Sequence, residues 1–333
     1  MLVKSREYDH LDRCLVQALQ LDGRVPFSRI AEVLGVSDQT VSRRYTRLRT
    51  EGVIRVLGLT DPAVLGEVTW LVRVQCTPDA AAKVAQALAR REDTAWVSLA
   101  SGGTEINCVT RSHVDEDAEG LLLQRLPRTP SVVGVTAQCV IHTFFGGSQG
   151  LSIKSDSLTE EQTRALRPPR PEPAAHGPVV LDAADRRMLA VLGADGRADL
   201  ADLAAASGWS QSTVRRRMAQ LRESGALYLD LDYDHRIFGL TARSLLWLTV
   251  APGQLAATGQ ALAEHPEVAF ACATTGATNL HAVVLCKDIQ SLYLYLTSRI
   301  AALPAVRQAE TAPILAALKR AGSLGSGLPL IQR

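Results

Sequence analysis

Apolar and polar residues alternate through residues 70–76, where Arg73 and Gln75 separate apolar neighbours. A period of two is the pattern of a half-buried strand. After this strand the sequence predicts a helix that Pro78 opens in its first turn, with Ala81, Val84 and Leu88 on one face. Two strands follow at 96–100 and 106–110, joined by a hairpin turn at 101–104. A helix around 121–126 and a strand at 132–143 complete the region. This order predicts a ferredoxin-like sandwich.

The residues upstream of this region have the spacing of a helix-turn-helix. Gly35 gives the turn a permissive backbone, Ser37 is placed to cap the second helix, and Gly52 is placed to end it. The apolar residues expected to face inward are Ile30, Ala31 and Leu34 in the leading helix and Val41, Tyr45 and Leu48 in the second. A DNA-reading helix of this kind needs a polar or basic outer face.

The whole pattern occurs twice. Residues 12–54 align without a gap with residues 185–227, always 173 positions later, and the triplet Asp-Gly-Arg at 22–24 recurs at 195–197. With one inserted residue the offset becomes 174, and the ferredoxin-like pattern recurs from about 245 to 315. We therefore predict an α+β protein of two repeats, each a winged or helix-turn-helix DNA-binding domain followed by a ferredoxin-like βαββαβ domain.

A proline-rich segment separates the two repeats. Prolines at 168, 169, 171 and 173 favour extended backbone and oppose a helix, so we interpret the segment as a semi-rigid linker, with a buried loop as the alternative. The predicted domains are a helix-turn-helix at 1–60, a ligand-sensing and assembly domain at 61–149, the linker at 150–179, a second helix-turn-helix at 180–235, a second sensing domain at 236–321 and a loosely packed tail at 322–333.

Both second helices carry arginines on the face left outside. An arginine-rich amphipathic helix found alone is more often a solvated face, but two copies with cap, turn glycine and inward residues in register favour DNA binding. The candidate DNA-binding residues are Ser37, Gln39, Thr40, Ser42, Arg43, Arg44 and Arg47 in the first repeat and Ser210, Ser212, Thr213, Arg215, Arg216 and Arg217 in the second. Arg44, Arg47 and Arg49 in the first repeat, with Arg217 and Arg222 flanking the second helix, are expected on phosphates, which would make the affinity for double-stranded DNA fall steeply with salt.

Composition limits the protein class and the compartment. With 333 residues, 47% of them apolar and 21% charged, the chain is long enough for several cores, while a formal charge of +2 does not by itself indicate a nucleic-acid partner. The six cysteines lack CxxC spacing and five lie in apolar runs, so we expect buried free thiols in a reducing cytosol. No signal peptide opens the chain and no apolar run approaches ~20 residues, so we expect a soluble cytoplasmic protein without a membrane partner.

The repeated motifs resemble those of a known family. Residues 181–189, 195–197 and 210–217 closely resemble the opening of the Lrp/AsnC (feast/famine) family of prokaryotic transcriptional regulators, and the first repeat matches the same pattern. The resemblance covers nearly all of both repeats. It implies a helix-turn-helix joined to a ferredoxin-like domain that senses a small molecule, commonly an amino acid, and assembles into oligomers.

The resemblance also implies an effector site at the central hairpin of each sensing domain. In the family a Thr-Gly-x-x-Asp hairpin lies near a small-molecule pocket at a subunit interface, and Glu105 and Asn279 depart from its aspartate. The matching positions are Ser101, Gly102, Thr104 and Glu105 in the first repeat and Thr275, Gly276, Thr278 and Asn279 in the second. The Glu105 carboxylate is expected to pair with a ligand ammonium group, and the alternative is a plain turn with solvated side chains.

The duplication has a mechanical consequence under this resemblance. Ordinary members dimerise through two identical sensing domains, whereas this chain is expected to bring its own two together and act as a covalent pseudo-dimer. Because the two DNA-reading units differ, we expect a lopsided palindrome with half-sites about one helical turn, roughly 34 Å, apart. Ser42 stands where the second repeat has Arg215, and an arginine can bond guanine with a discrimination of ~1–3 kcal/mol.

An enzyme of the same architecture is the alternative function. Some siroheme decarboxylases share this architecture, can be fused in tandem, and need basic or histidine side chains in a large pocket between the sensing domains. His142 and His281 lie in predicted strands, but their repeat counterparts are Ala316 and Asn107, which favours structural roles. The sequence has no P-loop, no GxGxxG after a strand, and no HExxH or GxSxG motif, so we expect no catalytic residues, metal or cofactor.

Overall fold

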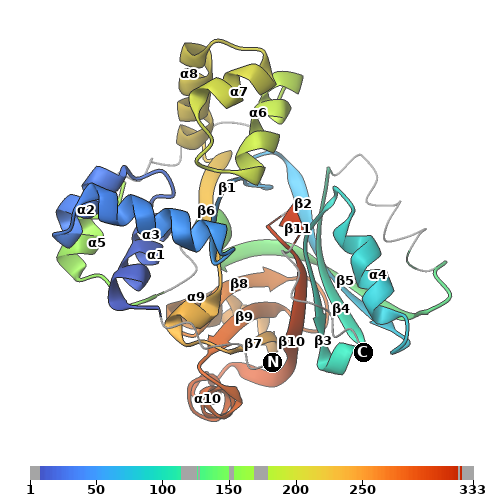
Figure 1. Cartoon of the computed structure of the whole chain (residues 1–333). Coiled ribbons are helices and arrows are strands. Elements are labelled where there is room, and N and C mark those ends of the chain that lie inside the picture. The colour runs from blue at the N-terminus through green and yellow to red at the C-terminus, as the bar shows by residue number, and fades with distance from the viewer. Residues whose placement is uncertain are drawn as a thin grey trace.

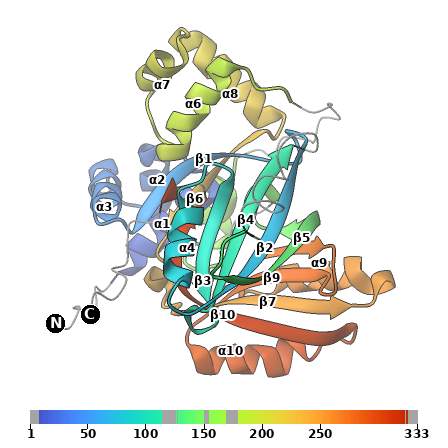
Figure 2. The same ribbon diagram turned by 90° about the vertical axis from the view of Figure 1, so that its right-hand side faces the viewer.

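Figure 1 shows a computed structural model of the chain, which describes residues 8–113, 126, 128–149, 154–168, 179–321 and 323–324. Two helical units, one from each repeat, stand beside a β-structure to which both repeats contribute (Figures 1 and 2). We call these units head 1, which is built from α1–α3, and head 2, which is built from α6–α8. The architecture is therefore the predicted α+β fold with the helix-turn-helix units set apart from the sheets.

Each head contains three helices. Head 1 contains α1 (His10–Leu21), α2 (Phe27–Leu34) and α3 (Asp38–Thr50), and head 2 contains α6 (Ala183–Ala194), α7 (Leu200–Ser207) and α8 (Gln211–Glu223). A capping box between Asp9 and Asp12 opens α1, and the equivalent box opens α6. Gly35 and Gly208 end α2 and α7 with φ of 66° and 81°, a left-handed conformation that glycine adopts without steric cost. The predicted turns are confirmed.

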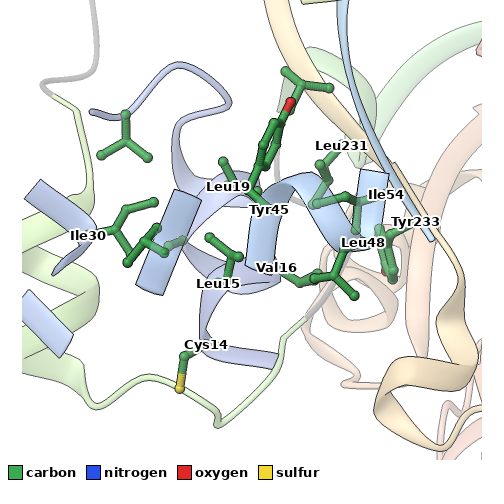
Figure 3. Close-up of a cluster of buried hydrophobic side chains, with 14 of the residues drawn as sticks. Cys14, Leu15, Val16, Leu19, Ile30, Tyr45, Leu48, Ile54, Leu231 and Tyr233 are labelled. Carbon is green, nitrogen blue, oxygen red and sulfur yellow. The ribbon is translucent and has the colours of Figure 1, made fainter. Parts of the chain in front are cut away.

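A two-stranded ribbon connects the heads with the sheets. β1 (Ile54–Thr60) of the first repeat pairs antiparallel with β6 (Leu227–Tyr233) of the second. Leu231 and Tyr233 of β6 pack in the same buried cluster as Leu19 and Leu48 of head 1 (Figure 3). The core of head 1 is therefore completed by a strand from the other repeat.

Each repeat contributes a ferredoxin-like sheet. The first contains β2 (Glu67–Cys76), α4 (Ala81–Ala89), β3 (Thr94–Ala100), β4 (Glu105–His113) and β5 (Val132–Phe145), and the second contains β7 (Ala242–Val250), α9 (Leu255–Glu264), β8 (Val268–Thr274), β9 (Leu280–Cys286), α10 (Ile289–Tyr295) and β10 (Val306–Arg320). The strands β2, β3, β4 and β5 confirm the strands predicted at 70–76, 96–100, 106–110 and 132–143. Pro78 lies in a turn before α4, so its predicted place in the first turn of the helix is wrong. The helix predicted around 121–126 falls almost wholly outside the described residues.

The last strand of each sheet continues into the other sheet. β5 pairs with β2 and, from Val140 onward, with β8, while β10 pairs with β7 and, from Ile314 onward, with β3. Pro313 marks the switch in β10, a position where a missing backbone donor is tolerated. The strands thus close a ring in the order β10-β3-β4-β2-β5-β8-β9-β7, with β11 (Ser323–Leu324) added at the edge of β10. The two sheets form one continuous β-structure within a single chain.

Part of the predicted linker is a helix. α5 (Glu160–Leu166) opens with a capping box between Thr159 and Gln162, and Leu158 and Leu166 are buried in the core of head 1. The prediction of a helix-free spacer over residues 150–179 is therefore wrong for this part. The prolines begin only at 168, so they do not restrict the turns before it. The proline-rich stretch 169–178 lies outside the described residues.

Candidate nucleic-acid interface

The second helix of head 1, α3, is held with its polar face outward. The Ser37 hydroxyl accepts a hydrogen bond from the Thr40 amide at 3.2 Å and so caps the helix. The residues predicted to face inward are buried, namely Val41, Tyr45 and Leu48. On the other side Gln39 and Arg43 are exposed and Ser42 is half-buried.

The corresponding helix of head 2, α8, has the same construction. The Ser210 hydroxyl accepts from the Thr213 amide at 3.2 Å. The buried residues are Val214, Met218 and Leu221. Ser212, Arg215 and Arg216 are exposed. Both helices therefore present a capped, polar N-terminal face at equivalent positions.

Two of the candidate arginines of head 1 point back into the head. Arg44 Nη1 lies 2.7 Å from Asp9 and 2.8 Å from Asp12, and Arg47 Nη2 lies 2.6 Å from Asp12. The Asp12 side chain is only 1% exposed, so its charge needs these partners. The guanidinium groups of Arg44 and Arg47 thus neutralise a buried carboxylate, while their expected contact with phosphates stays a prediction.

The same pair recurs in head 2. Arg217 binds Asp185 with both Nε, at 2.8 Å, and Nη2, at 2.7 Å, and the Asp185 side chain is fully buried. Burial raises the pKa of Asp185, but the Arg217 hydrogen bond and the Asp182 backbone amide outweigh it and leave the pKa below its usual value. Arg217 therefore supports the fold of head 2, while its predicted role on phosphates stays a prediction.

Three arginines remain available at the surface of the two helices. Arg43, Arg215 and Arg216 are exposed and, within the part of the chain that the structure describes, make no ion pair or hydrogen bond. Arg43 and Arg216 are repeat equivalents, whereas Arg215 stands where head 1 has Ser42. The cationic surface of head 2 is thus larger by one guanidinium group.

The repeated triplet Asp-Gly-Arg forms a reciprocal contact between the heads, which the sequence analysis did not predict. Arg24 of head 1 donates to the Ala198 carbonyl of head 2. Arg197 of head 2 donates to the carbonyls of Gly23, at 2.7 Å, and Val25, at 3.1 Å, in head 1. Each arginine therefore reaches into the other repeat, as in an interface with two-fold symmetry.

Two ion pairs also join the heads at positions that are equivalent in the two repeats. Arg49 lies 2.6 Å from Asp195, and the equivalent Arg222 lies 3.7 Å from Asp22. The guanidinium carbon of Arg197 lies 4.4 Å from the ring centroid of Phe27, a cation–π distance. The recurrence of both Asp-Gly-Arg triplets was the available signal, but it did not reveal that their partners lie in the other repeat.

The hairpin of the first sensing domain is occupied by internal contacts. Arg73 Nε and Nη2 lie 3.0 and 3.1 Å from the two Glu105 carboxylate oxygens, which also accept from Asn107 and Ser101. The Thr104 hydroxyl donates to the Ser101 carbonyl, and Gly102 has the positive φ of 71° that the turn requires. A ligand ammonium group at Glu105, as expected from the sequence, would have to displace or share these partners.

The second hairpin is also filled from within. Asn279 accepts from the Val250 amide at 2.9 Å and donates to its carbonyl at 2.8 Å. Gln138 Nε2 donates to the carbonyls of Thr275 and Thr278, and a Cβ built on Gly276 would lie 2.9 Å from the same nitrogen. The Gln138 side chain of β5 thus fills the inside of this turn.

The space between the two sheets is packed with large side chains. Trp247 is 1% exposed, and the Arg73 guanidinium carbon lies 3.9 Å from its ring centroid. Arg73 also bonds Glu310 of β10 at 2.5 Å. Burial, followed by the charge of Arg73, lowers the pKa of His281 to about 4, so it is neutral and structural, while His142 is exposed.

Three further expectations concern the described residues only. Five of the cysteines are buried and Cys139 is half-buried, and all six are free thiols. No group of three or more histidine, cysteine or acidic side chains lies close enough to hold a metal ion in the described ranges. Every helix that the structure describes is too short or too polar to cross a bilayer.

This geometry defines a protein with two helix-turn-helix heads on paired ferredoxin-like domains. The AsnC-type helix-turn-helix domain matches residues 9–49 and 181–222, and the Lrp/AsnC ligand binding domain matches residues 244–324. The chain belongs to the Lrp/AsnC family and carries its DNA-binding domain twice.

Relatives of this family align with less than half of the chain. An uncharacterized HTH-type transcriptional regulator of Pyrococcus furiosus is 29% identical over 126 residues, which are 37% of this chain and 85% of the relative. The HTH-type transcriptional regulator AldR of Mycolicibacterium smegmatis is 27% identical over 151 residues, 44% of this chain and 88% of the relative. Each relative thus corresponds to about one repeat.

A solved structure has a similar fold over both repeats. The siroheme decarboxylase NirDL superposes with a TM-score of 0.64 over 96% of this chain and 95% of that chain, at 14% sequence identity. At this identity the likeness establishes the fold, not the activity.

Proposed function

We propose that this chain is a sequence-specific DNA-binding transcriptional regulator in which one polypeptide supplies both DNA-reading heads. The observation that carries the proposal is the pair of capped helices α3 and α8, whose exposed Arg43, Arg215 and Arg216 have no partner among the described residues. An exposed cation at the N-terminal half of a recognition helix reaches bases or phosphates in the major groove. Gel-shift titration of the full chain against DNA selected from a random pool tests it, and failure to enrich any sequence would contradict it.

The chain acts as a covalent pseudo-dimer in this proposal. Support comes from the strand exchange of β5 and β10, from the β1–β6 ribbon and from the reciprocal Arg24 and Arg197 contacts, all of which lie within one chain. A two-fold arrangement of heads matches an operator with two half-sites, about one helical turn or ~34 Å apart.

The operator is expected to be asymmetric. Arg215 offers a guanidinium group where Ser42 offers a hydroxyl, so one half-site should contain a guanine that the other lacks. Arg215→Ser should weaken binding to the selected operator by about 1–3 kcal/mol and remove the preference for that guanine. Selection followed by sequencing measures both effects, with the reciprocal Ser42→Arg variant as the matched test. Selected sites with two identical half-sites would contradict the proposal.

A small molecule, such as an amino acid, modulates DNA binding in this proposal. The support is the match of residues 244–324 to the Lrp/AsnC ligand binding domain. Because both hairpins are filled by internal contacts, the effector would bind elsewhere in the sensing domains. Operator affinity measured with each of the amino acids in turn should change severalfold for at least one of them, and a constant affinity across the whole set would contradict this part.

We do not propose the decarboxylase activity. A siroheme would need a wide space between the sensing domains, and in this chain that region holds Trp247, Arg73 and the Glu310 carboxylate. Opening it would break a salt bridge and expose a fully packed indole.

A further inference from the structure

A cavity of about 190 Å³ lies where the two heads, the ribbon and the end of β10 meet. Its wall includes Arg49 at the end of α3, Arg55 of β1, Asp195 at the end of α6, Asp232 of β6 and Arg320 at the end of β10. A single buried water needs only ~15 Å³ of such space. The cavity can therefore hold a small polyatomic ligand that touches both heads.

The wall of the cavity carries more cations than anions. Arg49 lies 2.6 Å from Asp195, while Asp232 is shared by Arg55, at 3.1 Å, and Arg320, at 3.4 Å. Three guanidinium groups thus face two carboxylates. The Nε–H of Arg320 is buried and has no acceptor in the part of the chain that the structure describes. A buried donor without an acceptor is costly, and an oxyanion in the cavity would remove this cost.

The positive charge of Arg320 also lowers the pKa of two neighbouring residues, Arg243 and His235. Burial first, and then the charge of Arg320, lower the pKa of Arg243 to about 10, although Asp232 and Asp234 act in the opposite direction. Burial and the charges of Arg243 and Arg320 likewise lower the pKa of His235 to about 3. The Arg243 side chain makes no hydrogen bond or ion pair with any residue that the structure describes. Arg243 therefore adds a further positive charge near Arg320, against Asp232 and Asp234.

Two of the arginines in the cavity wall have no counterpart in the other repeat. Arg55 corresponds to Tyr228 in the other repeat, and Arg320 corresponds to Gly146. The position related by the internal two-fold axis therefore lacks both guanidinium groups. A ligand recognised by these arginines has one site in each chain.

We propose that this cavity binds a small phosphate-bearing anion, which is inorganic phosphate or a phosphate monoester, through Arg49, Arg55 and Arg320. The planar guanidinium group offers paired donors that match phosphate oxygens, and a phosphate anion offsets the one excess positive charge. Because Arg49 belongs to head 1 and its partner Asp195 to head 2, the bound anion adjusts the contact between the heads. This regulatory part rests on the proposed function, whereas anion binding itself does not.

The test is a titration of the full chain with inorganic phosphate in a chloride buffer of constant ionic strength, followed by calorimetry and by thermal unfolding. The wild-type chain should bind one phosphate saturably and unfold at a higher temperature when phosphate is present. Arg320→Gln should weaken the binding at least tenfold, and Arg320→Lys, which keeps the charge but loses the planar fork, should weaken it less. Arg307→Gln, at an exposed position of the same strand, is the matched control and should bind as the wild type does.

Two outcomes would overturn the proposal. One is phosphate binding that does not saturate or that is unchanged in Arg320→Gln, provided that this variant unfolds cooperatively in chloride buffer. The other is that the wild-type chain binds no free phosphate while Arg320→Gln loses affinity for DNA in phosphate-free buffer. In that case Arg320 would contact the phosphates of the DNA backbone and not a small anion. Absence of DNA binding by the wild-type chain would contradict the proposed function and leave the phosphate titration unaffected, so the two failures are distinguishable.

Discussion

Alanine at Arg43, Arg215 and Arg216 together is expected to lower the affinity for the selected operator by at least about a hundredfold. An arginine on a base edge or a phosphate contributes ~1–3 kcal/mol, and each tenfold change in affinity corresponds to ~1.4 kcal/mol, so three such residues give at least about two orders of magnitude. The salt dependence should also become shallower, by about one unit of slope for each phosphate contact removed. Gel-shift titration at several chloride concentrations measures both quantities.

The variant should fold as the wild type does, because the three side chains are exposed and unpaired among the described residues. Surface substitutions of this kind usually change the free energy of unfolding by less than about 0.5 kcal/mol. Arg90→Ala combined with Arg307→Ala removes two exposed arginines of the ferredoxin-like domains and is the matched control. Equal DNA affinity of the triple variant and this control would remove the basis of the proposed function.

Neutralising Arg44 and Arg217 would not be an equivalent test. Arg217 neutralises the buried Asp185, so its loss would leave an uncompensated carboxylate inside head 2, and Arg44 shares the buried Asp12 with Arg47, so its loss would remove one of two cations from that carboxylate. A loss of DNA binding in such variants would report damage to the fold. The distinction between the two kinds of arginine comes from the structure, because all of them lie on the same sequence motif.

The sequence predicted what depends on local spacing. The inward positions Val41, Tyr45 and Leu48, the cap at Ser37 and the turn at Gly35 follow from helical periodicity and capping rules within one head. The first strand of the first sensing domain follows from alternation with a period of two, the next two follow from apolar segments on either side of a hairpin turn, and the strands of the second domain follow from the repeat. These patterns fix an element and the face that it buries.

The sequence did not predict contacts between distant elements. The crossing of β5 into the second sheet and the burial of Glu105 by Arg73 depend on which surfaces meet in space, and no local period encodes this. The helix α5 was missed for a different reason. Its signals, a Thr159–Gln162 capping box and leucines at 158 and 166, are present in the sequence, but the neighbouring prolines dominated the interpretation. The sequence could not distinguish the exposed arginines from the internally bound ones. The carboxylate partners of Arg44 and Arg217 lie more than thirty residues away in the sequence.

Alanine at both Arg24 and Arg197 is expected to loosen the contact between the heads without unfolding them. The two side chains reach across the repeat boundary to backbone carbonyls, and Arg197 also stacks on Phe27, so their loss removes the reciprocal contact. Affinity for an operator with both half-sites depends on the second head binding from a fixed position, at a high effective concentration. We expect this affinity to fall at least about tenfold, while affinity for a single half-site stays unchanged.

The prediction is specific because it compares DNA that contains both half-sites with DNA that contains a single half-site. Arg186→Ala, at an exposed position on α6 of head 2, is the matched control and should bind both DNA lengths as the wild type does. Hydrogen exchange in α3 and α8 checks that the heads remain folded in the double variant. If single half-site binding fell as far as binding to the full operator, the arginines would support each head individually. If neither affinity changed, the ribbon and the ring of strands would be sufficient to hold the heads, and the Asp-Gly-Arg contact would have no part in spacing them.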